Sequence, residues 1–524
     1  MNNFSRSQTV RKPATVSRGG IVAAQHRRAA EAGAAVLEAG GDAIDAAVAV
    51  SFAIGVVEPW MSGPTGGGAM MVWRADEAKA TAVYYGMRSP AGLDPADYPL
   101  SGDGHASDLF PWRAVVDDRN VRGATAVAVP GVVDGIGVAH ERWGKMPWRD
   151  LLQPAVSLAR EGLHVDWYAA LIIASVSREL ARDPDAARVF LEDSQWPTIA
   201  GWTALSDKRI DFGPMADTLA RLAEKGHREL YEGEIGEALA KDIQGKGGSL
   251  SFEDLKVYRA AFQKPLVAES RRGRLHVTPE LTAGPTIADV FARLAEAPDR
   301  RGTSEGDNML AVAEAFEAAY AKRLSAMGDN ESPNAPACTT HFSIVDRHGN
   351  MVAMTQTLLS IFGSRIISPS TGLLLNNGIM WFDPEPGNPN SLAPNKRCLM
   401  NVCPVIGEGE SKRFAIGASG GRKIMPAVTQ LSLSMLEDGM DIDAAFHRPR
   451  IDFSGGTTVV ADETLPAEVM AALKARYPVQ PAKRTVFPYA FACPAGVMRE
   501  GEINSGATEI MSPWGDAVHE KEGT

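Results

Sequence analysis

The chain has 524 residues, of which 45% are hydrophobic and 22% are charged, and its formal net charge at pH 7 is −11. This composition is ordinary for a globular protein, and an acidic balance without basic runs argues against a nucleic-acid partner. No stretch approaches the ~18 uninterrupted apolar residues of a membrane span. The first twenty residues carry basic side chains without a following apolar run, so we expect no signal peptide and a cytoplasmic protein.

Metal and disulfide chemistry find little support in the sequence. No two cysteines form a C-x-x-C pair, so we expect plain buried thiols. The His140-Glu141 pair lacks the second histidine of an H-E-x-x-H motif, so no metal is expected. The cysteines are Cys338, Cys398, Cys403 and Cys493.

Helical periodicity dominates the first two thirds of the chain. Residues 28–37 and 42–56 read as two helices separated by a glycine pair, and Asp42 is a plausible N-cap of the second. Helices are also expected between residues 129 and 162, with a break near Gly144. Strands of the antiparallel type cluster after residue 338, between these helices and a few later ones. This order predicts a layered α+β fold.

One junction concentrates the chemistry. Residues 329–336 read DNESPNAP, which is loop composition, and they lead directly into the strand-like run 338–346. A turn at 348–350 then reverses the chain into a second strand, 351–357. Thr339 and Thr340 therefore stand where a loop enters a buried strand.

A threonine hydroxyl is a weak nucleophile unless a base takes its proton, and an N-terminal threonine can use its own α-amine. That amine titrates near ~8 and is partly neutral at pH 7. It exists only if the chain is cut before the threonine. From the residues alone, β-propensity and cross-strand packing are the more common explanation of a threonine pair in a strand.

The sequence TTHFSIVDRHGNMVAMTQT, which begins at Thr339, resembles the start of the small subunit of γ-glutamyltransferases. These enzymes are N-terminal-nucleophile hydrolases that cut themselves. The segments GGDAIDAAVAVSFAIGVVEPWMSGPTGGGAMMV, PNKR and GASGGRKI occur in the family's order, and the resemblance runs from about Gly19 to the end. It implies a four-layer αββα sandwich. It also implies a large fragment, 1–338, and a small fragment, 339–524, that form one composite domain as a heterodimer, with further oligomerisation left open.

The resemblance also assigns site residues. It implies a cut between Cys338 and Thr339, with Thr339 as the nucleophile and Thr357 as the hydroxyl that supports it. The backbone N–H groups of Gly420 and Gly421 correspond to the oxyanion hole. The expected activity is cleavage of a small-molecule amide through an acyl-enzyme, without a metal or an organic cofactor.

The substrate-binding positions depart from the family. Relatives hold the α-carboxylate of a γ-glutamyl group with an arginine where this chain has Gly86, and Arg88 lies two residues on. Their acidic partner for the α-amine is Trp381 here, and their serine pair is Met400-Asn401. A buried amino-acid head without partners costs several kcal/mol. We therefore expect an acyl group without that head, as in cephalosporin acylases or oxamate amidohydrolase. The alternative is γ-glutamyl or glutathione hydrolysis, with Arg88 or Asn401 restoring recognition.

Two other hypotheses remain open. Residues 417–421 fit G-x-S-x-G between a strand and a helix, the setting of a nucleophile elbow in an α/β-hydrolase, with Ser419 as nucleophile. Few βα alternations precede it, which argues against that fold. An uncut scaffold that only binds would migrate as a single band on a denaturing gel. The acids and bases available to the elbow are Asp441, Asp443, His447 and His519.

Overall fold

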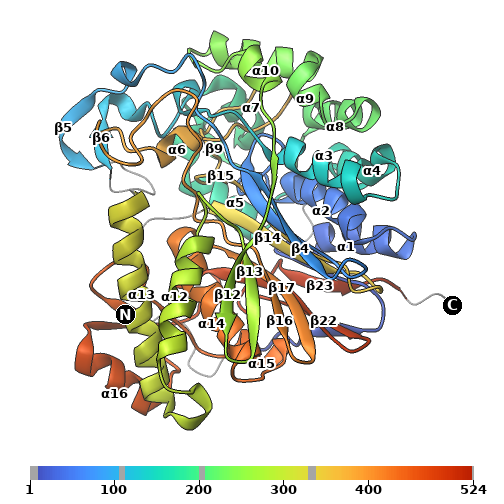
Figure 1. Ribbon diagram of the computed structural model, residues 1–524. Helices are drawn as coiled ribbons and strands as arrows, with labels where there is room; N and C mark the ends of the chain where they lie inside the picture. The colour runs from blue at the N-terminus through green and yellow to red at the C-terminus, as the bar shows by residue number, and fades with distance from the viewer. Residues whose placement is uncertain (1–9, 106–111, 200–206, 328–337, 522–524) are drawn as a thin grey trace.

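Two antiparallel sheets stacked face to face form the centre of the molecule, and helices cover both outer faces (Figure 1). The computed structural model describes residues 10–105, 112–199, 207–327 and 338–521. Helices α1 to α4 lie over the first sheet, and α12 to α14 lie over the second. The predicted α+β class and the four-layer αββα sandwich are confirmed.

Each sheet has seven strands among the described residues. The first, in spatial order, contains β11 (Ala261–Gln263), β4 (Lys79–Tyr85), β3 (Gly67–Arg74), β15 (Met351–Leu359), β14 (Cys338–Val345), β2 (Ile21–Ala24) and β23 (Asp516–His519). The second contains β1 (Thr15–Ser17), β22 (Ile503–Thr508), β21 (Cys493–Glu500), β17 (Lys412–Ser419), β16 (Val405–Gly409), β13 (Gly273–Val277) and β12 (Leu266–Ser270).

The helices over the first sheet begin as the sequence predicts. Asp42 caps α2, because its side chain accepts hydrogen bonds from the N–H groups of Ile44 and Asp45. Every residue of α2 is buried, since the helix lies between the first sheet and α1, α3 and α4. The helices of this side are α1 (Arg27–Glu38), α2 (Ala43–Val57), α3 (Val132–Trp143), α4 (Trp148–Glu161) and α8 (Gly213–Lys225).

The second sheet is covered by α12 (Gly284–Glu296), α13 (Glu305–Met327), α14 (Ile424–Leu436) and α15 (Ile442–His447), with α16 (Ala467–Arg476) packed on α13. The structure also contains α5 (Trp167–Ser175), α6 (Ser177–Leu180), α7 (Pro184–Phe190), α9 (Glu229–Glu232), α10 (Glu234–Gly245) and α11 (Phe252–Lys256). Among the described residues, no helix is both long and apolar enough to cross a bilayer.

Strand β14 is central in its sheet, between β15 and β2. Phe342 pairs with Met354 on one side and with Ala24 on the other. Both sheets contain strands from before and after residue 338, so the two halves of the chain share one core. Between the sheets lies a buried apolar layer that includes Met71, Trp73, Val345, Ile406 and Val497.

The two sheets approach each other closely at His341 and Gly417. A Cβ at Gly417 would lie 2.4 Å from Cε1 of His341. The His341 ring is fixed by Thr355 Oγ1 at 2.8 Å and Ser343 Oγ at 2.9 Å, so it has little freedom to move aside. The missing side chain at residue 417 therefore sets how closely β17 packs on β14.

We expect Gly417→Ala to lower the free energy of unfolding by ~1–3 kcal/mol, because the added methyl group overpacks the contact with the fixed ring. Denaturant-induced unfolding measures it. The matched control is Gly409→Ala on β16, where the nearest atom to an added Cβ is Lys412 Cγ at 3.4 Å. Equal stability of the two variants would contradict the expectation.

Candidate active site

The peptide bond between Cys338 and Thr339 is surrounded by hydroxyl groups in the intact chain. Thr339 Oγ1 and Thr357 Oγ1 each donate a hydrogen bond of 2.6 Å to the carbonyl oxygen of Cys338. The two hydroxyl oxygens lie 3.4 Å apart. Thr339 is only 5% exposed. One hydroxyl is thus next to the carbonyl carbon that it would attack, and the other is on the oxygen where negative charge would develop.

The backbone around this bond is irregular. The β14–β15 register shifts between Cys338 and Thr340, opposite Leu359, whose φ is 87°. Such a conformation is strained for a leucine. It brings the Leu359 N–H to 2.8 Å from Thr357 Oγ1, which accepts its hydrogen. Thr357 Oγ1 thus accepts one hydrogen bond from the Leu359 N–H and donates its own proton to the Cys338 carbonyl.

The turn after β17 requires glycine. Gly420 has φ 132° and Gly421 has φ 57°, conformations that L side chains rarely adopt. A Cβ at Gly420 would also lie 3.0 Å from Cα of Ala492. A short 3₁₀ turn, Gly421–Lys423, then leads into α14. Backbone N–H groups at the start of a helix attract negative charge, so this turn can stabilise an oxyanion.

A chain of side chains joins this turn to the strand that carries Thr339. Gln25 Nε2 donates to Ser419 Oγ at 2.7 Å and to the Cys493 carbonyl at 2.8 Å. Thr340 Oγ1 lies 3.3 Å from both Gln25 Oε1 and Glu58 Oε2. Burial raises the pKa of Glu58 to about 8, although the hydrogen bond with Thr340 opposes the shift. At neutral pH this carboxyl is mostly protonated and can donate.

His341, next to this chain, is not a base for the reaction. Burial lowers its pKa to about 3, so the ring is neutral, and both ring nitrogens are hydrogen-bonded to hydroxyl groups. Its role is to fill the space between the sheets.

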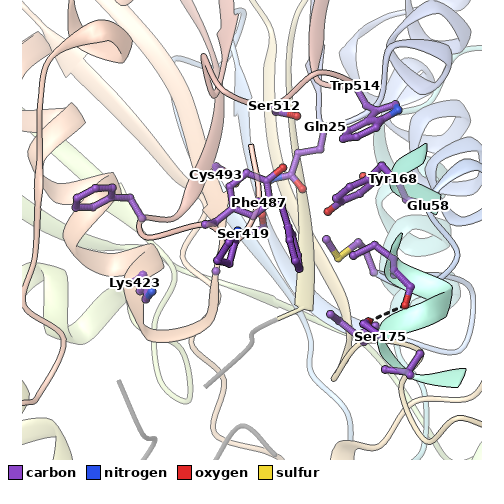
Figure 2. Close-up of a pocket in the computed structure, with 18 of the residues that line it drawn as sticks. Gln25, Glu58, Tyr168, Ser175, Ser419, Lys423, Phe487, Cys493, Ser512 and Trp514 are labelled. Atoms are coloured by element: carbon purple, nitrogen blue, oxygen red, sulfur yellow. Dashed lines mark hydrogen bonds between the residues drawn. The ribbon is translucent and has the colours of Figure 1, made fainter. Parts of the chain in front are cut away.

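A cavity of about 510 Å³ opens beside the glycine turn (Figure 2). This volume is typical of small-molecule sites. Its wall includes Gln25, Glu58, Ser419 and Gly420. Met61, which contacts Cys338 Sγ, also lines the cavity. The lining also includes Arg122, Tyr168, Glu179, Arg365, Lys423, Phe487, Tyr489, Phe491 and Trp514.

The four predicted substrate-binding residues do not line this cavity. Trp381 and Met400 are 3% and 0% exposed within an apolar cluster that also contains Tyr84, Met87 and Leu359.

Arg88 and Asn401 lie near this apolar cluster but are not part of it. The backbone of Arg88 bridges to Val129 and Arg397. Asn401 Oδ1 accepts from Arg323 Nη2 at 2.9 Å.

Ser419 lacks the surroundings of a nucleophile elbow. It ends an antiparallel strand rather than a parallel one. Its hydrogen-bond partner is the Gln25 amide, and among the described residues no histidine lies within hydrogen-bond distance of its hydroxyl. His447 and His519 instead contact backbone carbonyls, those of Asp443 and Glu520. The sheet geometry excludes the α/β-hydrolase fold that the motif suggested.

Comparison with known proteins identifies the lineage of this site. Residues 29–338 and 334–490 match the sequence model of the family described as gamma-glutamyltranspeptidase. The chain belongs to this family. It is 33% identical over 506 residues to the Acylase ACY 1 proenzyme of Pseudomonas sp. (strain V22), with 89% of this chain and 88% of that one covered. It is 30% identical over 520 residues to the glutathione hydrolase proenzyme of Bacillus subtilis (strain 168), with 88% and 85% covered.

The fold agrees with this assignment. The cephalosporin acylase from Bacillus halodurans superimposes with a TM-score of 0.84 at 22% identity, and the match covers 100% of this chain and 99% of that one. As a member of the γ-glutamyltranspeptidase family, the chain is an autoprocessing amide hydrolase or acyltransferase of the N-terminal-nucleophile type.

Sequence reasoning missed most of the cavity wall. Gln25, Tyr168 and Trp514 come from distant parts of the chain, and no motif marks them. Glu58 lies within a segment that resembles the family, but its burial and its contact with Thr340 become visible only in three dimensions.

The hydroxyl geometry predicts self-cleavage between Cys338 and Thr339. We expect Thr339→Ala to stay intact and Thr339→Ser to cleave. Thr357→Val should slow cleavage by ~10²–10³-fold, because it removes a donor to the developing oxyanion. Denaturing gels over time and N-terminal sequencing of the small fragment measure this. If Thr339→Ala still cleaves at the same bond, another group carries out the reaction. The same holds if cleavage is lost in Ser419→Ala but not in Thr339→Ala.

The raised pKa of Glu58 predicts a pH-dependent stability difference. Between about pH 4.5 and 8 the unfolded chain ionises Glu58 while the folded chain keeps its proton, so the wild type loses stability as pH rises. Glu58→Gln has no ionisable group at this position and therefore does not lose stability as the pH rises through this range. Its melting temperature should exceed that of the wild type increasingly from pH 5 to pH 8 and by a constant margin above.

Glu509→Gln is the matched control for this measurement. Glu509 is buried, which alone would raise its pKa, but Arg450 and Arg484 lower it overall, and Arg450 Nη2 lies 2.6 Å from its carboxylate. Its neutralisation should destabilise the protein across pH 5–8. A difference between Glu58→Gln and wild type that does not change with pH would disprove the assignment.

Proposed function

We propose that the protein is an N-terminal-threonine amide hydrolase whose acyl substrate lacks the α-amino acid head of γ-glutamyl compounds. Self-cleavage before Thr339 would release its α-amine and leave fragments 1–338 and 339–524 together as a heterodimer. The shared sheets support this pairing, because each fragment supplies strands to both. The cytoplasmic location stays a prediction from the sequence.

In the proposed reaction, the Thr339 amine takes the proton of its own hydroxyl, and Oγ1 attacks the carbonyl carbon of the substrate amide. The N–H groups of Gly420 and Gly421 hold the oxyanion, and each such donor is worth ~2.7–4 kcal/mol in the transition state. The amine of the substrate leaves with the proton that the Thr339 amine had taken. Water then attacks the ester carbonyl, which frees the acid and restores the Thr339 hydroxyl.

The observation that carries the acyl preference is the space around Gly86. A Cβ at this position would lie 2.4 Å from Tyr84 Oη and 2.9 Å from Met400 Cε. A carboxylate-binding arginine therefore has no room at residue 86 beside Met400. Trp381 belongs to the same buried apolar cluster. An ammonium and a carboxylate placed here would lose their hydration without gaining partners.

The second candidate function is hydrolysis of γ-glutamyl compounds, as the glutathione hydrolase relative is named. Arg88 favours it, because its Nε and Nη2 are buried, have no hydrogen-bond partner among the described residues and could serve a carboxylate. Asn401 supports it less, since Arg323 already occupies its amide oxygen.

A pair of anilides distinguishes the two functions. We expect kcat/KM for a glutaryl anilide to exceed that for the matching γ-glutamyl anilide by ~10-fold or more, because only the latter places an α-ammonium group in the apolar cluster. Steady-state hydrolysis followed by aniline release measures the ratio. A tenfold preference for the γ-glutamyl anilide, ~1.4 kcal/mol, would reverse the proposal, and Arg88→Ala and Asn401→Ala would then show which residue recognises the head.

A further inference from the structure

The cavity beside the glycine turn has an aromatic wall built from distant segments. Tyr168 on α5 stacks on Trp514 with ring centroids 4.0 Å apart, and Phe487 meets Tyr168 edge-on at 6.4 Å. Tyr489 and Phe491 continue the wall along the same loop as Phe487. Flat apolar surfaces of this kind favour a planar ring over a flexible aliphatic chain.

The end of the cavity next to the glycine turn carries a positive charge. Lys423 lies two residues after Gly421 and lines the cavity at the end away from Tyr168 and Trp514 (Figure 2). Its Nζ donates to the Ala490 carbonyl at 3.0 Å, which places the ammonium group beside Tyr489 and Phe491. An ammonium group has three donors. Among the described residues no carboxylate forms an ion pair with Lys423, so donors remain for a ligand.

The other charged groups of the cavity leave this end positive. Arg122 pairs with Asp118, and Arg365 donates to the Val121 carbonyl at 3.1 Å. The acidic side chains of the lining are Glu58 and Glu179, the latter on α6. The buried Asp452 carboxyl interacts electrostatically with Lys423 but does not line the cavity. Aromatic rings next to an accessible ammonium group form a surface suited to an aromatic carboxylate.

We propose that this cavity is a substrate subsite for an aromatic ring that carries a carboxylate, with the ring against Phe487, Tyr489 and Phe491 and the carboxylate on Lys423. The inference rests on the proposed amide hydrolysis and names the chemistry of one part of the substrate. The carboxylate can belong to the acyl group or to the leaving amine, and both sources offer the same contacts to Lys423.

Binding to an uncut variant tests the subsite without turnover. In Thr339→Ala, isothermal titration with phenylacetate and with its neutral isostere phenylacetamide should show tighter binding of phenylacetate. Adding Lys423→Met should weaken phenylacetate at least tenfold and leave phenylacetamide unchanged. Lys412→Met is the matched control, because Lys412 Nζ also donates to backbone carbonyls, those of Gly439 and Met440 at 3.0 Å each, but lies outside the cavity.

Kinetics of the processed enzyme assign the source of the carboxylate. One pair of substrates shares a butyryl group and differs in the amine, 4-aminobenzoate or 4-aminobenzamide. The other shares aniline and differs in the acyl group, 4-carboxyphenylacetyl or 4-carbamoylphenylacetyl. We expect a preference for the carboxylate of at least tenfold in kcat/KM within one pair, and its loss in Lys423→Met.

The two proposals fail in different ways. Equal binding of phenylacetate with and without Lys423, together with unchanged substrate ratios, would overturn the subsite while leaving the glutaryl preference intact. A γ-glutamyl preference with Lys423-dependent phenylacetate binding would overturn the acyl proposal alone.

Discussion

The carbonyl oxygen of Cys338 accepts two hydroxyl hydrogen bonds, and the geometry of the site depends on this arrangement. It requires Thr339 and Thr357 on one face of neighbouring strands, the register shift opposite Leu359, and the Leu359 N–H that orients the Thr357 hydroxyl. Edge strands could not hold such a geometry firmly. Here β14 and β15 lie in the interior of the sheet, covered by α2 on one face and by β17 on the other.

Close packing of the two sheets brings β17 against β14, the strand that carries Thr339. Because Gly417 has no side chain, β17 can approach the His341 ring. Gln25 then spans from Ser419 to Thr340. The serine of the G-x-S-x-G motif therefore acts as an acceptor that ties the turn to the first sheet.

The sequence was sufficient for the features that local patterns encode. The hairpin at 348–350 and the Asp42 cap follow from residue type and spacing, and the family motif pointed to Thr339. The predicted loop at 329–336 lies outside the described residues. The cavity could not be predicted in this way. Tyr168, Phe487 and Trp514 are neighbours only because α5 and two late loops meet over the edge of the first sheet, and such contacts leave no periodic signal.

The apolar cluster around Gly86 shows why specificity in this site is a collective property. Met400 Cε and Tyr84 Oη occupy the space that a side chain at residue 86 would need, and Trp381 and Met87 close the same cluster. Gly86→Arg alone would place a guanidinium against these groups, where it would clash and lose its hydration. An arginine there requires a smaller residue than Met400, and a polar partner requires the replacement of Trp381. The departures from the γ-glutamyl pattern are therefore coupled through packing, and reversal of one of them would lower stability before it restored recognition.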